Sequence, residues 1–230
     1  MTATSAKLSA RAWALATALL LLVGLASVAA PSARADENSL LRSATSAAPQ
    51  AQQIITVTAA SASSTTAQLS AWIPKDGQWS RVFGPITAHL GSQGIGAAQD
   101  EVPRTPQGVW SLDQAFGRQA NPGSAMPYFQ ATRSDWWDGS ASSPTYDRQV
   151  NAPSSPGNGS ENLYDAGPVY DYAVHFDNNP SHTPGKGSAF FLHVTDGNPT
   201  AGCVAVDRQS MISILKWLSP AYKPVIAIGT

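Results

Sequence analysis

The sequence predicts a mainly β domain with one helix near its C-terminal end, and three observations support this fold class. Glycine and proline are frequent, at 18 and 17 of 230 residues, and charged residues make up only 13% of the chain. This composition is typical of short strands joined by turns. Several segments alternate apolar and polar side chains, whereas one segment, after the single cysteine, has a helical repeat.

The predicted strands begin after a polar N-terminal stretch. In the first of them Ile55, Val57 and Ala59 share one face, as expected of a strand that is buried on one side. Pro74 and Gly77 mark the turn that ends the second strand. Strands are expected over residues 54–60, 67–73, 79–83, 87–90, 109–112, 169–176, 189–194 and 225–228.

The one predicted helix runs from Arg208 to Ser219. Asp207 is a suitable N-cap residue, and Pro220 stops the helix. Apolar residues repeat along one face of this segment, as they do in a helix that packs on a core. Those residues are Met211, Leu215 and Leu218.

Residues 1–35 are typical of a secretory signal peptide. Lys7 and Arg11 precede a long apolar run, and small residues then provide a cleavage site between Ala35 and Asp36. From the signal peptide we expect export to the cell wall, a periplasm-equivalent space or the extracellular medium. An uncleaved membrane anchor is the alternative interpretation.

Residues 36–53 are rich in serine and alanine without an apolar period, so we expect a flexible leader there. Residues 54–230 then form one domain. Removing residues 1–35 leaves 11 basic and 15 acidic residues, a net charge of −4. This charge argues against a nucleic-acid-binding protein, and we expect a monomer with no integral membrane domain after signal removal.

The single cysteine, Cys203, cannot form an internal disulfide bond in an exported protein. A cysteine attacks a carbonyl carbon as the thiolate, so a catalytic thiol needs a base nearby, usually histidine. His193 ends an apolar strand ten residues earlier, and a hairpin between them would bring the two side chains together. A buried structural thiol is the competing interpretation.

Two separated motifs resemble the L,D-transpeptidase (YkuD-like) catalytic domain family. Phe191-Leu192-His193-Val194 followed by Thr200-Ala201-Gly202-Cys203-Val204 is similar to the family signature of a strand-borne histidine and [Ser/Thr]-x-Gly-Cys. Arg104-Thr105-Pro106-Gln107-Gly108-Val109-Trp110 is similar to an upstream turn of that family. The resemblance covers roughly residues 54–229 and implies an L,D-transpeptidase-like β-sandwich or β-rich domain.

The resemblance also implies a mechanism. Cys203 would attack the peptide bond after the third residue of a peptidoglycan tetrapeptide stem, release D-alanine and form a thioester that an amine resolves. His193 would serve as the base, oriented by a backbone carbonyl near Val194. Thr200 would brace the loop, and the amides of Gly202 and Cys203 would hold the oxyanion. No cofactor is expected.

The sequence departs from the family pattern at two positions beside these residues. Val194 stands where a glycine often follows the histidine, and Ala205 stands where an arginine often follows the cysteine. The second departure leaves recognition of the stem carboxylate open. Arg208, Arg148 and Lys186 are candidate replacements, and each is equally consistent with a solvated surface charge.

Other candidate residues concern the substrate and a metal ion. Trp136 and Trp137 lie in a long loop-rich segment and Tyr172 lies on a predicted strand, so all three could line a substrate cleft or serve as packing anchors. No cluster of histidine, cysteine and carboxylate residues has the spacing of metal ligands, so no metal site is expected.

The expected function is thus an L,D-transpeptidase-like cysteine acyltransferase that acts on peptidoglycan stem peptides in cell-wall cross-linking or remodelling. Two alternatives stay open. An L,D-carboxypeptidase would use water as the acceptor, and a wall-binding protein would keep the fold without turnover.

Overall fold

The computed structural model describes residues 31–230, with side chains from residue 36 onward. The predicted signal peptide therefore lies almost entirely outside the described residues. The domain is mainly β, which confirms the predicted fold class. None of the helices in the described part of the chain is long and apolar enough to span a membrane.

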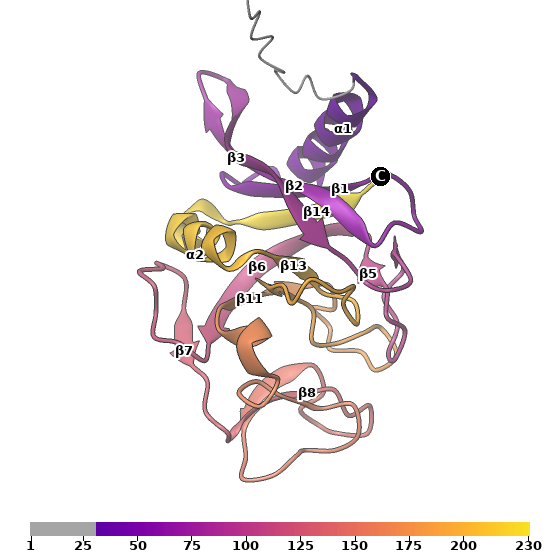
Figure 1. The fold of residues 1–230 in the computed structure, drawn as a ribbon, viewed down its shortest axis with the longest axis vertical. Coiled ribbons are helices and arrows are strands. Elements are labelled where there is room, and N and C mark those ends of the chain that lie inside the picture. Colours follow the sequence, from indigo (N-terminus) through magenta and orange to yellow (C-terminus); the bar gives the residue numbers. More distant parts are fainter. Residues whose placement is uncertain (1–30) are drawn as a thin grey trace, which may run out of the picture.

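Nine strands form one mixed sheet in the order β11-β12-β13-β3-β2-β1-β14-β6-β7. β11 also pairs with β6, so the sheet curls round and closes on itself (Figure 1). The strands are β1 (Ile54–Ala59), β2 (Thr66–Lys75), β3 (Gln78–His89), β6 (Gly108–Gly117), β7 (Tyr128–Gln130), β11 (Ala173–Asp177), β12 (Phe191–Val194), β13 (Val204–Val206) and β14 (Val225–Gly229).

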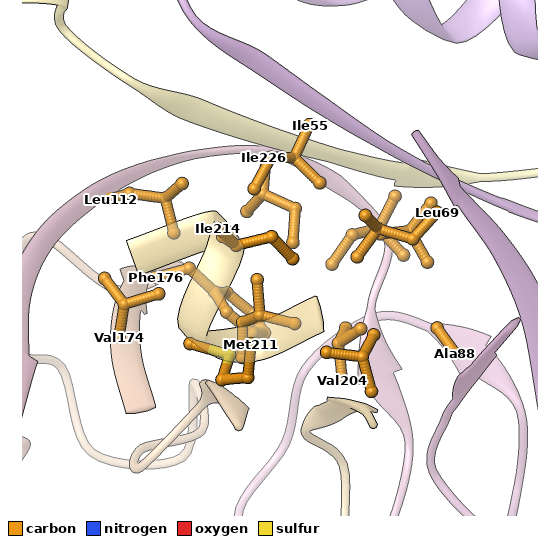
Figure 2. Packing of buried hydrophobic residues seen from close by; sticks show 14 of the residues in the cluster. Ile55, Leu69, Ala88, Leu112, Val174, Phe176, Val204, Met211, Ile214 and Ile226 are labelled. Carbon is orange, nitrogen blue, oxygen red and sulfur yellow. The ribbon is translucent and has the colours of Figure 1, made fainter. Parts of the chain in front are cut away.

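The main core fills the space between the curled sheet and helix α2 (Arg208–Trp217). The side chain of Asp207 caps this helix by accepting a hydrogen bond from the Ser210 N–H at 3.0 Å. Met211 and Ile214 project from α2 into the core, where they meet strand residues (Figure 2). The helix predicted after the cysteine is therefore present, and its apolar face closes the interior of the sheet.

Most of the flexible leader predicted at residues 36–53 is helical, which corrects the expectation. Helix α1 (Pro31–Ala47) lies against β1 and β14, at the end of the molecule opposite β8 (Asp135–Asp138) (Figure 1). Leu41 and Ala44 are buried there in a cluster with Trp72. The sequence pattern concealed this helix because, from residue 36 onward, only three apolar side chains make its buried face, those of Leu40, Leu41 and Ala44.

Two further expectations are wrong in detail. The strand predicted over residues 169–176 begins as the 3-10 helix η1 (Gly167–Tyr170), because Gly167 has a positive φ of 86° and Pro168 follows it. In addition, β12 and β13 pair in parallel, so the segment between His193 and Cys203 is not a hairpin.

The loop-rich segment 121–159 contributes a small lobe below the main sheet, around β8 in Figure 1. The sheet of this lobe has the order β10-β8-β9, with β10 contributed by the residues just after the segment, and it packs over a second apolar cluster that includes Phe191 and Cys203. The remaining short elements are β4 (Ile95–Gly96), β5 (Thr105–Pro106), β8 (Asp135–Asp138), β9 (Arg148–Asn151), β10 (Glu161–Asn162) and η2 (Pro220–Tyr222).

Candidate active site

Cys203 and His193 line the same cavity, which has a volume of about 930 Å³. The walls come from the end of β12, the loop that follows it, the β8–β10 lobe and the segment before β5. This volume lies in the range of sites that take small molecules and short peptides. The two residues singled out from the sequence are therefore brought to one accessible cavity.

The loop before Cys203 is braced by the hydroxyl groups of two threonines. Thr200 donates a hydrogen bond to the Cys203 carbonyl oxygen at 2.7 Å. Thr105, from the upstream motif, donates to the same oxygen at 3.3 Å and accepts the Gly91 N–H at 2.8 Å. The two motifs recognised in the sequence therefore meet at the backbone of the cysteine.

Gly202 fits its position because of its backbone conformation and its lack of a side chain. Its φ is +143°, and a Cβ atom there would come within 2.6 Å of the Phe190 ring and 3.1 Å of the Arg104 carbonyl oxygen. Its N–H donates to the Thr200 hydroxyl at 3.0 Å. To stabilise an oxyanion, the Gly202 amide would have to exchange this partner.

The imidazole of His193 is buried and held by backbone. Its Nδ1 lies 2.8 Å from the Val194 carbonyl oxygen. Burial lowers the pKa of His193, whereas the carbonyl groups of Val194 and Val169 and the charge of Asp196 act in the opposite direction. The ring is therefore neutral at neutral pH, and one of its nitrogens carries a lone pair that can accept a proton.

The side chains of His193 and Cys203 lie diagonally across the β12–β13 pair. His193 is opposite Ala205, whereas Cys203 lies two residues earlier, beside Phe191. The thiol accepts the Phe191 N–H at 3.4 Å and donates to the Ala189 carbonyl oxygen at 3.5 Å. Within residues 36–230, no hydrogen bond joins the thiol to the imidazole.

The resting thiol is not activated by its surroundings. Burial raises the pKa of Cys203 to about 12, and the charge of Glu161 adds to this effect. Hydrogen bonds from the Phe191 N–H and the Tyr170 hydroxyl act in the opposite direction. The cysteine is therefore a neutral thiol at neutral pH, and its ionisation has to be coupled to substrate binding or to proton transfer.

The aromatic residues proposed from the sequence as substrate contacts do not line the cavity. Trp137 is 4% exposed, and its indole N–H donates to a carboxylate oxygen of Asp147 at 3.0 Å. The Trp136 N–H donates to a backbone carbonyl at 3.3 Å, and Tyr172 packs beneath the guanidinium of Arg208. Their placement corresponds to the packing interpretation, and a contact with substrate stays a prediction.

None of the three candidate replacements for the missing arginine lines the cavity either. The exposed Arg208 forms an ion pair with the buried Asp171, and Arg148 and Lys186 are exposed. The charged groups that do line it are four carboxyl groups. They belong to Asp100, Glu101, Glu161 and Asp196.

Two residues of the cavity were missed by the sequence reasoning. Tyr170 and Glu161 lie beside the thiol, and the Tyr170 hydroxyl donates to a Glu161 carboxylate oxygen at 2.9 Å. Tyr170 was placed in a predicted strand, and Glu161 follows the loop-rich segment 121–159, outside every predicted strand. Neither position carries a local signal, because only the folding of the β8–β10 lobe against η1 brings them to Cys203.

Two comparisons with known proteins found similar proteins. A family model described as the L,D-transpeptidase catalytic domain (YkuD) matches residues 64–226, more than two thirds of the chain. The crystal structure of the helical cell shape determining protein Pgp2 from Campylobacter jejuni is similar at 12% sequence identity and a TM-score of 0.38, covering 76% of this chain and 46% of that one. The chain thus spans about half the length of Pgp2. No curated protein matches the chain. On the family match, the chain belongs to the L,D-transpeptidase (YkuD) catalytic domain family.

Proposed function

We propose that this protein is a peptidoglycan L,D-transpeptidase that forms a thioester between Cys203 and a tetrapeptide stem. The observation that carries the proposal is the placement of Cys203 and His193 in one cavity of about 930 Å³, in a chain of this family. A cavity of that size can hold the end of a stem peptide. The N-terminal segment supports the further proposal that the protein is exported to the cell wall or beyond.

The proposed reaction has two halves. The Cys203 sulfur attacks the carbonyl carbon of the third stem residue, and the bond from that carbon to the nitrogen of D-alanine breaks. An amine of a second stem then attacks the thioester and restores the thiol. His193 is suited to proton transfer because it is neutral, and because the carbonyl groups of Val194 and Val169 stabilise the protonated ring when it forms.

The test is covalent labelling of the mature protein. Incubation with a carbapenem, and separately with a tetrapeptide donor, should add the mass of the acyl group to the peptide that contains Cys203. Cys203→Ala should abolish the adduct, and His193→Ala should slow its formation by about 10²-fold or more. Absence of an adduct with both donors, in a folded wild-type protein, would refute the proposal.

The structure also favours one second candidate, a wall-binding protein that has lost turnover. The observation is the protonated, buried thiol, which forms no hydrogen bond with the base among the described residues. On this hypothesis the protein binds purified cell-wall sacculi, and Cys203→Ala leaves both binding and cellular phenotype unchanged. If acylation occurs, products formed with and without an added amine will separate a transpeptidase from an L,D-carboxypeptidase.

A further inference from the structure

The Cys203 cavity has an acidic lining. Four carboxyl groups line it, and no lysine or arginine among the described residues does. Residues 36–230 contain 11 basic residues, so this absence does not come from a shortage of cations in the protein. The excess of negative charge is therefore a feature of the cavity itself.

The four carboxylates come from three segments that are distant in the sequence. Asp100 and Glu101 precede β5, Glu161 lies on β10, and Asp196 follows β12. Because different walls of the cavity supply the same sign of charge, their potentials add inside it. A cleft with such a lining raises the local concentration of cations and lowers that of anions.

One of the four carboxylates, that of Asp100, is engaged with the fold. It accepts hydrogen bonds from the Tyr146 hydroxyl and from the N–H groups of two glycines in the loop before β12. These bonds tie that loop to the segment before β5. Glu101 and Asp196, in contrast, are exposed at the cavity, where a ligand can meet them.

The carboxylate of Glu161 is held beside the reacting groups by Tyr170. The Tyr170 hydroxyl donates to Glu161 Oε2 at 2.9 Å, and the Tyr170 ring packs edge-to-face on the imidazole of His193 with the centroids 5.3 Å apart. The other oxygen, Oε1, accepts no hydrogen bond from residues 36–230. Glu161 therefore keeps acceptor capacity for a cationic group of a ligand.

This carboxylate does not assist the nucleophile. Burial raises the pKa of Cys203 to about 12, and the charge of Glu161 raises it further. A negative charge in the cavity also opposes the oxyanion that forms when a carbonyl group is attacked. The position of Glu161 is therefore unfavourable for the thiol, and binding of a cationic ligand gives it a role.

The cavity also lacks the cation expected from the family pattern. Ala205, which stands where an arginine often follows the cysteine, lines the cavity with a methyl group. Arg104, in the upstream motif, packs its side chain on Gly96 and does not line the cavity either. A carboxylate on a ligand thus meets like charges there and no basic side chain of the described residues.

We propose that the acidic lining selects peptide ends that carry a positive charge, the ammonium group of the third stem residue, and disfavours a free carboxylate on that side chain. Glu101, Glu161 and Asp196 determine this specificity. The identity of the peptide rests on the proposed function, whereas selection by charge is a property of the cavity. The ammonium group can belong to the donor stem or to the acceptor amine, and the experiments separate the two.

The first experiment needs no peptide. Two methanethiosulfonate reagents of similar size, one with a trimethylammonium group and one with a sulfonate group, modify the Cys203 thiol. The ratio of their rates is divided by the same ratio for 2-mercaptoethanol, which corrects for intrinsic reactivity. At about 0.1 M ionic strength the corrected ratio should favour the cation by at least about fivefold, and it should fall in about 1 M salt.

The variants test the named residues. Glu101→Gln, Glu161→Gln and Asp196→Asn should each lower the corrected ratio by about two- to fivefold, and the triple variant should bring it close to one. Because both reagents attack the same sulfur, any change in thiol reactivity cancels in the ratio. Asp165→Asn removes an exposed carboxylate that does not line the cavity and should leave the ratio unchanged. Circular dichroism establishes that each variant is folded.

The second experiment uses tetrapeptide donors that differ only in the third side chain, which is that of lysine, norleucine or 2-aminopimelate. The acylation rate should follow the order ammonium, methyl, carboxylate, with at least about tenfold between the extremes. A fixed donor is then used to measure how the thioester partitions between water and the amine of Nα-acetyl-lysine amide. A loss of donor selectivity in the triple variant assigns the ammonium to the donor, and a loss of transfer to the amine assigns it to the acceptor.

The outcomes separate the two proposals. If the corrected reagent ratio is close to one, or if neither donor selectivity nor partitioning changes in the triple variant, selection by charge is wrong, while an adduct at Cys203 still supports the transpeptidase. If no donor acylates the wild type but the reagent ratio favours the cation and falls in the variants, the transpeptidase proposal fails and selection by charge stands.

Discussion

Ionisation of the Cys203 thiol controls any chemistry in the cavity, and the fold shifts it to high pH. Burial raises the pKa of Cys203 from 9.0 to about 12. This difference corresponds to about 4 kcal/mol in favour of the neutral thiol. At pH 8 the ionised fraction is then about 10⁻⁴, compared with about 10⁻¹ for an ordinary thiol.

The assay is a titration of thiolate absorbance in the ultraviolet, with the Cys203→Ala variant subtracted to remove the contribution of tyrosine. The wild type should show no thiolate step below about pH 10. A step centred below pH 9 would show that a cation, such as protonated His193, stabilises the ionised sulfur, and it would refute the reasoning from burial.

The same shift predicts how stability depends on pH. Because the folded-state pKa lies above that of the unfolded chain, the contribution of Cys203 to the free energy of unfolding is complete below about pH 9. It is lost as the pH rises toward 12. Urea titrations at several alkaline pH values should therefore show a shallower loss of stability in Cys203→Ala than in the wild type.

Four further substitutions test other contacts. Thr105→Val keeps the shape of a fully buried side chain but loses both of its hydrogen bonds. Urea denaturation should therefore show a free energy of unfolding lower by about 1–3 kcal/mol. Acylation should also slow, because the loop before Cys203 is held less firmly. Gly202→Ala should abolish acylation and lower the melting temperature, because its Cβ atom would clash with Phe190. Burial by itself would raise the pKa of Asp138, but hydrogen bonds from hydroxyl and N–H groups lower it below its ordinary value. The stabilisation from Asp138 is therefore present above pH 3.8 and is lost as the pH falls below it. Asp138→Asn should make the free energy of unfolding depend less on pH in this acidic range. Leu41→Ala should cost roughly 2–5 kcal/mol in thermal unfolding if α1 is part of the folded domain, and nothing if α1 is a free tether.

Local patterns were sufficient for several elements of the fold. The alternation at Ile55 and Val57 predicted β1, and the Asp207 cap with the apolar repeat from Met211 predicted α2. These signals are local because periodicity and capping depend on residues within one or two turns or a few strand positions. The motif around Cys203 was likewise readable, since its glycine meets a backbone requirement at its own position.

Only the tertiary structure decided how these pieces meet. The parallel pairing of β12 with β13 sets His193 diagonal to Cys203, and no pattern within either short strand specifies that register. Tyr170 on η1 and Glu161 on β10 line the same cavity as the thiol, and no local pattern predicts this placement either. The sequence by itself determined several of the strands, helix α2, the resemblance to the family and the candidate nucleophile. The tertiary structure decided the protonation state of that nucleophile and its neighbours, because burial and the hydrogen-bond partners of a thiol arise from segments that are distant in the chain.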